Sequence, residues 1–244
     1  MLSEAEAKDA IKNILANTGN INNPMKFIRS VIKERAIGKV YDTILACNDC
    51  KINAPLKTIG YGNLDASVMI IGDYPLEEQF LTNKKILHPF EGTKHLSYIN
   101  ALFEKIGINK NELYWLNTIQ CYPVSNNKYR CPYTCEIDRC SIFMKYIVDV
   151  IHPSMIILLG NVALNCFKKV PMNEIHGQWI DAFTVPAMPT YSPAYIAQLE
   201  KFNYDIDKIN SLKNAMYKDM EIAFEYLKNK YPNNNVTQKK GEIV

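Results

Sequence analysis

Residues 68–73 read Val-Met-Ile-Ile-Gly-Asp, a short apolar run that stops at a glycine and an acidic residue. Runs of this kind are typical of strands that are buried on both faces. Two later runs have the same design: residues 113–117 read Leu-Tyr-Trp-Leu-Asn, and residues 155–160 read Met-Ile-Ile-Leu-Leu-Gly. Segments in which apolar residues recur at helical spacing separate the three runs. This alternation predicts an α/β fold with a mostly parallel sheet that helices cover on both faces.

Helices and further strands are expected on both sides of these runs. The expected helices span residues 3–16, 24–46 (as one helix or two), 96–106, 136–151, 161–168 and 205–229, and residues 179–191 contain one or two expected strands. We divide the chain into an N-terminal helical extension over residues 1–40, a domain over residues 41–230 and a tail over residues 231–244. The tail is polar and has the composition of a disordered segment.

Composition and charge are those of an ordinary globular protein. Hydrophobic residues make up 48% of the sequence, and 28 basic against 25 acidic side chains give a net charge of +3. This balance does not by itself indicate nucleic-acid binding. The acidic start lacks a secretory signal, and the apolar runs are too short to span a bilayer. We expect a soluble, intracellular protein without a membrane partner, whose seven cysteines are thiols or metal ligands rather than disulfides.

The spacing of the cysteines favours a metal site. Four of them are spread over three segments: Cys47, Cys50, Cys121 and Cys140. Four thiolates are the ligands of a [4Fe–4S] cluster and equally of a structural zinc ion. Cys131 and Cys135 also have the spacing of metal ligands. Spacing alone therefore leaves the ligand set open, and a redox pair or buried thiols are the simpler alternatives.

Small and polar residues follow the expected strands. In parallel sheets, ligands bind in the crevice beyond the carboxyl ends of the strands. Gly72 and Asp73 stand at one such end, and Asn117 and Gly160 stand at two others. These positions are therefore the first candidates for a binding or catalytic site.

Several motifs in a fixed order connect these features to a known family. They are Cys47-x-x-Cys50, Gly72-Asp73-Tyr74-Pro75, His88-Pro89-Phe90-Glu91-Gly92, Leu116-Asn117-Thr118-Ile119-Gln120-Cys121, Ile156-Ile157-Leu158-Leu159-Gly160-Asn161 and Tyr191-Ser192-Pro193. Over about residues 40–203 the sequence resembles the family 4 uracil-DNA glycosylases, the iron–sulfur branch of the uracil-DNA glycosylase superfamily. No single motif carries the resemblance, which depends on their common order.

The resemblance implies a three-layer α/β/α domain with a central four-stranded parallel sheet. It also implies a structural [4Fe–4S] cluster held by Cys47, Cys50, Cys121 and Cys140, with zinc as the alternative metal. Glycosylases extrude the target nucleotide into a pocket, where its base is stacked and read. The implied activity is hydrolysis of the N-glycosidic bond of uracil or a modified pyrimidine in DNA.

Three residues match the pocket of that family. Phe90 matches the phenylalanine on which the base stacks, and Asn117 matches the asparagine that reads the base through one amide acceptor and two donors. Asp73 occupies the position of a glutamate, where a carboxylate orients water and stabilises positive charge on the sugar. The structural alternatives are a core ring for Phe90 and a turn residue for Asn117.

Three other residues depart from the family pattern. Tyr74 replaces a small residue and Leu76 replaces a glycine, so both add bulk close to the base. Tyr74 is then either a filter for base specificity or a plug. Ser192 stands where the family has a histidine that donates to the base O2. A serine hydroxyl still donates one hydrogen bond but carries no positive charge, and loss of such a donor costs about 10²–10³ in rate.

Two basic residues, Lys128 and Arg130, occupy a loop that resembles a conserved stretch of the family. We expect both side chains to contact DNA phosphates, with a solvated basic turn as the alternative. DNA is therefore the expected partner.

The first functional hypothesis is a DNA glycosylase that acts in base excision. The second is a catalytically inactive relative that binds DNA or a replication or repair protein, which Tyr74, Leu76 and Ser192 favour. The third is a zinc-binding module without an iron–sulfur cluster.

Overall fold

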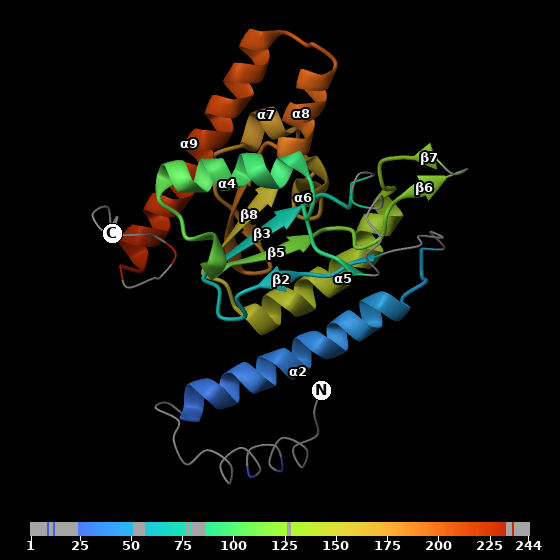
Figure 1. Ribbon diagram of the computed structural model, residues 1–244, viewed down its shortest axis with the longest axis vertical. Helices are drawn as coiled ribbons and strands as arrows, with labels where there is room; N and C mark the ends of the chain where they lie inside the picture. The colour runs from blue at the N-terminus through green and yellow to red at the C-terminus, as the bar shows by residue number, and fades with distance from the viewer. Residues whose placement is uncertain are drawn as a thin grey trace.

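The computed structural model describes residues 24–50, 57–76, 86–125 and 128–232, and the single residues 9, 12, 79 and 236. The helix expected over residues 3–16 and most of the expected tail lie outside the part that is described. Within it, a sheet is sandwiched between two layers of helices (Figure 1).

The centre of the domain is a six-stranded sheet with the order β2-β5-β3-β8-β10-β9. Its strands are β2 (Tyr61–Gly62), β3 (Val68–Gly72), β5 (Leu113–Asn117), β8 (Met155–Leu159), β9 (Ile180–Ala182) and β10 (Val185–Thr190). The four inner strands are parallel, and β2 and β9 pair antiparallel at the two edges. The expected four-stranded parallel core is confirmed, and the two short edge strands make the sheet wider than expected.

Alternate residues of the inner strands belong to two separate cores. In β3, Val68 and Ile70 pack with the layer formed by α4 (Lys94–Ile106), α8 (Pro193–Lys201) and α9 (Ile206–Lys230). Their neighbours Met69 and Ile71 pack with α2 (Pro24–Ala46) and α5 (Thr134–Ile151) on the other face. Each such side chain contributes about 1.5–3 kcal/mol when fully buried. The apolar runs therefore form strands buried on both faces, and the three-layer fold is confirmed.

The two longest helices lie in opposite layers. Residues 24–46 form one continuous helix, α2, and α9 extends over 25 residues near the C-terminus. Ile37 and Ile44 of α2 pack in the core beneath the sheet, and Met216 and Met220 of α9 pack in the core above it. No helix among the described residues is both long and apolar enough to cross a membrane.

Short elements surround the carboxyl ends of the parallel strands. They are the pair β1 (Lys57–Thr58) and β4 (Ile86–Leu87), the hairpin β6 (Val124–Ser125) and β7 (Lys128–Tyr129), and the helices α6 (Asn161–Asn165) and α7 (Met172–Ile175). A 3-10 turn, Lys110–Glu112, precedes β5. The helix α6 ends at Asn165, earlier than the expected residue 168, and the backbone N–H groups of Phe167 and Lys168 both donate to the Leu164 carbonyl in the turn that follows.

Candidate active site

The expected site residues meet at one edge of the sheet. Gly72 of β3 lies opposite Asn117 of β5 on one side and Leu159 of β8 on the other. Leu159 in turn lies opposite Thr190 of β10, and Ser192 follows two residues later. The carboxyl ends of the four parallel strands therefore form one row, as expected for a ligand site in an α/β sheet.

Phe90 and Asn117 converge on the glycine that ends β3. A Cβ placed on Gly72 would lie 2.4 Å from Cζ of Phe90 and 3.0 Å from Oδ1 of Asn117. Both side chains are buried, and the Phe90 ring meets the Trp115 ring edge-on with the centroids 5.8 Å apart. A flat ring and an amide therefore stand side by side, which is the combination needed to stack a base and read its edge.

The backbone at Phe90 is held in an unusual conformation. Its φ of 62° lies in the left-handed region, which costs a non-glycine residue about 1–2 kcal/mol. Thr93 fixes this conformation, because its backbone N–H and its hydroxyl both donate to the Phe90 carbonyl. Thr93 also caps α4 by accepting a hydrogen bond from Leu96 N. The ring is thus anchored to the start of a helix.

Asn117 is tied to neighbouring segments. Its Nδ2 donates to Oγ1 of Thr58 at 3.4 Å. The following residue, Thr118, donates from its backbone N–H and from its hydroxyl to the carbonyl of Gly72. These bonds fix the turn after β5 against the end of β3. Asn117 is therefore positioned by β1, β3 and β5 together.

The Asp73 carboxylate lies at the first turn of α6. Its Oδ1 accepts hydrogen bonds from the backbone N–H groups of Val162 and Ala163, each at 2.9 Å. Burial raises the pKa of Asp73 to about 7, although the two amides oppose that shift. The close approach of the Asp73 carboxylate to the backbone requires a glycine at position 160. A Cβ atom there would lie 2.2 Å from Oδ2 of Asp73, and the φ of Gly160 is 106°. The carboxylate thus both caps a helix and stands beside the candidate base site.

Ser192 begins a helix at the end of β10. Its Oγ accepts a hydrogen bond from Ala194 N at 3.2 Å, and Pro193 occupies the first turn of α8. The residue is buried, with 7% of its surface exposed. Because the cap uses the oxygen as an acceptor, the hydroxyl hydrogen remains a donor.

Tyr74 turns towards α5 rather than towards the Phe90 side of the sheet. Its ring packs against a small cluster that contains Ile137 and Cys140 of α5. Its hydroxyl lies 3.5 Å from Sγ of Cys131. Leu76, the other bulky departure, donates its backbone N–H to Oε1 of Gln79.

The Arg130 guanidinium is occupied within the protein. It forms a bidentate ion pair with the Glu136 carboxylate, in which Nη1 donates to Oε2 at 2.8 Å and Nη2 donates to Oε1 at 2.6 Å. Burial opposes ionisation of Glu136, but Arg130 and the Tyr133 backbone N–H hold its pKa below the usual value. Lys128 lies in β7, and its side chain is outside the described part. Arg130 is therefore a structural residue at this turn, and phosphate contact remains a prediction for both.

Four cysteines gather between α2, the sheet and α5. Electrostatic interaction with Cys121, Cys50 and Cys47 contributes to the raised pKa of Cys140, behind the larger effect of burial. The pKa of Cys121 is raised in the same way, by burial first and then by Cys47 and Cys50. Cys131 and Cys135 are exposed, whereas Cys47, Cys50 and Cys121 are partly buried and Cys140 is buried.

Two cations hold the loop that carries the Cys-x-x-Cys pair. Lys57 donates to the carbonyls of Ile44, Leu45 and Cys47 at the end of α2. Arg139 of α5 donates to the carbonyl of Asp49 at 2.9 Å and lies near Cys50. Among the described residues, no three potential ligands already stand in positions that could hold a metal ion. The four thiols thus share a place and a charge environment suited to an anionic cluster, and metal ligation would require them to close together.

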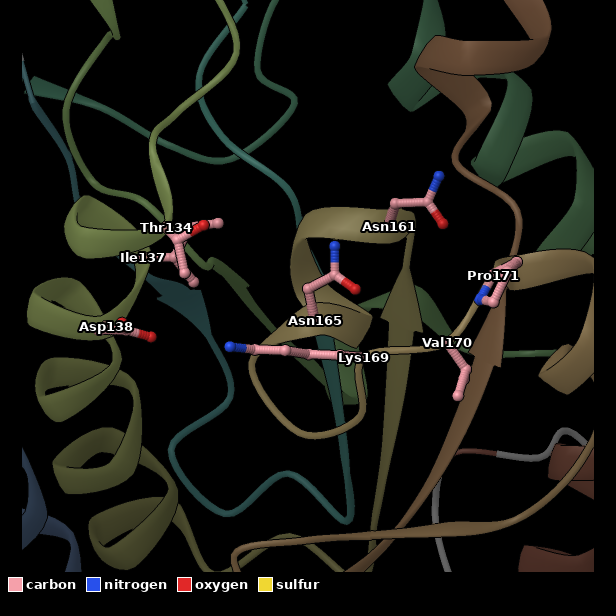
Figure 2. Close-up of a pocket in the computed structure, with 8 residues that line it drawn as sticks. All are labelled: Thr134, Ile137, Asp138, Asn161, Asn165, Lys169, Val170 and Pro171. Carbon is pink, nitrogen blue, oxygen red and sulfur yellow. The ribbon is translucent and has the colours of Figure 1, made fainter.

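A pocket of about 450 Å³, lined by both polar and apolar side chains, lies between α5, α6 and the segment that precedes α7. Figure 2 shows Asn161, Asn165 and Lys169 on one side and Thr134, Ile137 and Asp138 on the other. Phe90, Asn117 and Ser192 do not line it. The pocket is therefore beside the α6 turn that binds Asp73, rather than at the aromatic end of the site.

One buried network near the site has no counterpart in the sequence analysis. Asp219 of α9 accepts from the Thr190 hydroxyl at 2.6 Å and lies 3.0 Å from Nδ1 of His176. It joins α9 and the end of α7 to the last residue of β10, immediately before the Tyr191-Ser192 turn. Residues this far apart in the chain give no local sequence pattern.

Comparisons with known proteins identify relatives over most of the chain. A family profile described as the uracil DNA glycosylase superfamily matches residues 59–220. A type-4 uracil-DNA glycosylase of Thermotoga maritima is 27% identical over 202 residues, which is 80% of this chain and 97% of the relative. One from Saccharolobus solfataricus is 28% identical over 167 residues, covering 64% of this chain and 74% of the relative. A DNA polymerase of Bacillus phage SP01 is 25% identical over 199 residues, covering 81% of this chain but 19% of the polymerase.

Proposed function

The chain belongs to the uracil DNA glycosylase superfamily, as its motifs predicted, and from this membership we propose that it is a DNA glycosylase acting on uracil or a modified pyrimidine. The observation that carries the proposal is the meeting of Phe90 and Asn117 at Gly72. The type-4 relatives support uracil as the base and base excision repair as the process.

The reaction breaks one bond and forms one. Water adds to C1′ of the deoxyribose while the bond between C1′ and N1 breaks, and the electron pair leaves with the pyrimidine. Phe90 stacks on the base, and the Asn117 amide hydrogen-bonds to its edge. The Ser192 hydroxyl donates one hydrogen bond to the O2 that gains negative charge. A proton from water leaves to solvent or to Asp73, and the released base takes one up.

Asp73 has a pKa suited to this work. A group whose pKa is about 7 is divided between carboxylate and acid near neutral pH. As carboxylate it stabilises the positive charge that develops on the sugar. The two amides of α6 hold Oδ1, so the remaining oxygen, Oδ2, is the atom we assign to water.

We also propose that Cys47, Cys50, Cys121 and Cys140 hold a [4Fe–4S] cluster, with zinc as the alternative. When bound, the cluster supplies a cross-link between the end of α2, the segment after β5 and α5. The positive charges of Lys57 and Arg139 beside the thiols suit such an anionic group. DNA is the partner that the activity requires.

The test of activity is single-turnover release of base from single-stranded and duplex DNA that contains uracil or modified pyrimidines. The wild-type protein should release at least one of these bases, and Asn117→Ala should slow release by about 10²–10³. Absence of release from every substrate would exclude the glycosylase proposal.

A second candidate, an inactive relative that binds DNA or a replication or repair protein, is favoured by Ser192 and by the similarity to part of a phage DNA polymerase. Ser192→His separates the two candidates. In a weakened glycosylase the histidine should raise excision by about tenfold, or about 1.4 kcal/mol. An inactive relative should remain without activity in both forms.

A further inference from the structure

Three tyrosines form a row beside the candidate base site: Tyr122, Tyr129 and Tyr74. The Tyr122 and Tyr129 rings are stacked, with centroids 5.0 Å apart and an interplanar angle of 23°. The Tyr74 ring is tilted against Tyr129 with a centroid distance of 5.8 Å. Tyr122 is buried, whereas Tyr129 is 36% exposed. The row thus contains one buried ring, Tyr122, and one exposed ring, Tyr129.

The tyrosine row continues the site on the side away from Phe90. Tyr74 directly follows Asp73, so one end of the row is joined to the carboxyl end of β3. Phe90 packs in the core of α4 and α9, whereas Tyr74 packs against α5 on the opposite face. Tyr129 lies on the β6–β7 hairpin, which projects beyond the carboxyl ends of β3 and β5 (Figure 1).

The exposed ring is held in place before any ligand arrives. The backbone N–H of Arg130 donates to the Pro123 carbonyl at 3.1 Å, and β6 pairs with β7 through Val124 and Tyr129. The Tyr74 hydroxyl lies 3.5 Å from Sγ of Cys131, two residues after Tyr129. A fixed aromatic ring contributes stacking area at little cost in conformational entropy.

We propose that Tyr129 is a stacking site for an unpaired nucleobase adjacent to the extruded one, so that the protein prefers single-stranded or locally unpaired DNA. This inference rests on the proposed glycosylase function and specifies its substrate class. Every base has a flat face, so such a site holds DNA without reading its sequence. A paired base in a duplex is already stacked on both sides and offers no face to the ring.

The test uses the 244-residue chain and a fluorescent oligodeoxynucleotide that lacks uracil, as a single strand and as a duplex. Tyr129→Ala removes the ring, and Tyr129→Phe keeps it. Tyr231→Ala is the matched control, because Tyr231 is 37% exposed and follows α9, whose end lies far from the hairpin in Figure 1. Stacking contributes about 1–3 kcal/mol per base, so Tyr129→Ala should raise the single-strand Kd at least about fivefold. The duplex Kd and the two other variants should change less than about twofold.

Several results would overturn the stacking site. They are an unchanged Kd in Tyr129→Ala, an equal loss on duplex, or an equal loss in Tyr129→Phe. If Tyr129→Ala fails to fold, 2-aminopurine placed at successive positions of the strand reports on the wild-type protein. Its fluorescence should be quenched at one position on binding, and no quenching at any position contradicts the proposal. Because this DNA contains no uracil, failure of excision and failure of stacking are separate results.

Discussion

Gly72→Ala is the substitution that tests the geometry of the base site most directly. The new methyl group would lie 2.4 Å and 2.9 Å from two carbons of the Phe90 ring. Ordinary carbon contacts are about 3.5–4.0 Å, so the ring must move by about 1 Å. Phe90 is buried against Trp115 and has little space to move. Overpacking of this kind costs about 1–3 kcal/mol, which is about 2–12 °C in melting temperature for a domain of this size.

The same shift should impair catalysis as well as stability. A displacement of about 1 Å at a positioned group costs up to about a hundredfold in rate. The assays are urea unfolding and single-turnover base release. Gly38→Ala is the control, since its added methyl group meets nothing within 4 Å beyond its own helix backbone and its helical position should gain about 0.5–1 kcal/mol.

A double variant identifies the contact that is responsible. In a Phe90→Leu background the ring is gone, and the methyl group at position 72 meets Oδ1 of Asn117 at 3.0 Å as its nearest remaining contact. The cost of Gly72→Ala should therefore fall, with a coupling free energy of about 1 kcal/mol or more. A Gly72→Ala variant that melts and excises like the wild type, or that costs the same in both backgrounds, would contradict this contact.

Three further predictions concern the cluster, Asp73 and the hairpin. Cys47→Ser should lose iron and lower the melting temperature, whereas the exposed Cys131→Ser should keep its iron; full iron in both would remove Cys47 from the ligand set. The pKa of Asp73 is about 7 in the folded protein and 3.8 in the unfolded chain, so the protonated carboxyl group favours folding. Its contribution to the free energy of unfolding is greatest below pH 3.8 and declines towards pH 7. The Asp73→Asn variant has no titratable group at this position. Its free energy of unfolding in urea should therefore depend less on pH between pH 4 and 7 than that of the wild type, and an identical profile would contradict the assignment. Arg130→Ala should destabilise the protein by about 2 kcal/mol or more by leaving Glu136 unpaired. Lys128→Ala should leave stability unchanged and reduce the salt slope of DNA binding by about one. The reverse pattern would place Arg130 on DNA.

The apolar runs predicted the sheet because their burial is a local property of the sequence. Four parallel strands need both faces covered, and this requirement is visible in residues 68–72 without knowledge of their neighbours. The edge strands β2 and β9 have two and three residues, which is too short for a periodic signal. The positions of strands could therefore be predicted where a run of residues is continuously buried. The edge strands could not be predicted in this way, because their positions depend on pairing with a neighbouring strand.

The partners of charged groups could not be predicted in the same way. Asp73 bonds to amides about 90 residues further along the chain, and only the fold brings α6 to it. Arg130 was expected at DNA because its loop resembles a stretch of the family, and its ion pair with Glu136 could not be predicted from that resemblance. Sequence gives the charge of a side chain, whereas its role depends on which opposite charge the fold places within reach.

Ser192 has a structural role beside the chemical role that we propose for it. Its oxygen caps α8, and loss of such a cap costs about 1 kcal/mol. A histidine at this position would supply a stronger donor to a leaving base but would not cap the helix in the same way. In the proposed reaction, the serine therefore secures the turn after β10 but stabilises the leaving base less than a histidine would. The proposed catalysis must then depend more on the ring and the amide that meet at Gly72 and on the Asp73 carboxylate, which the α6 amides hold in place.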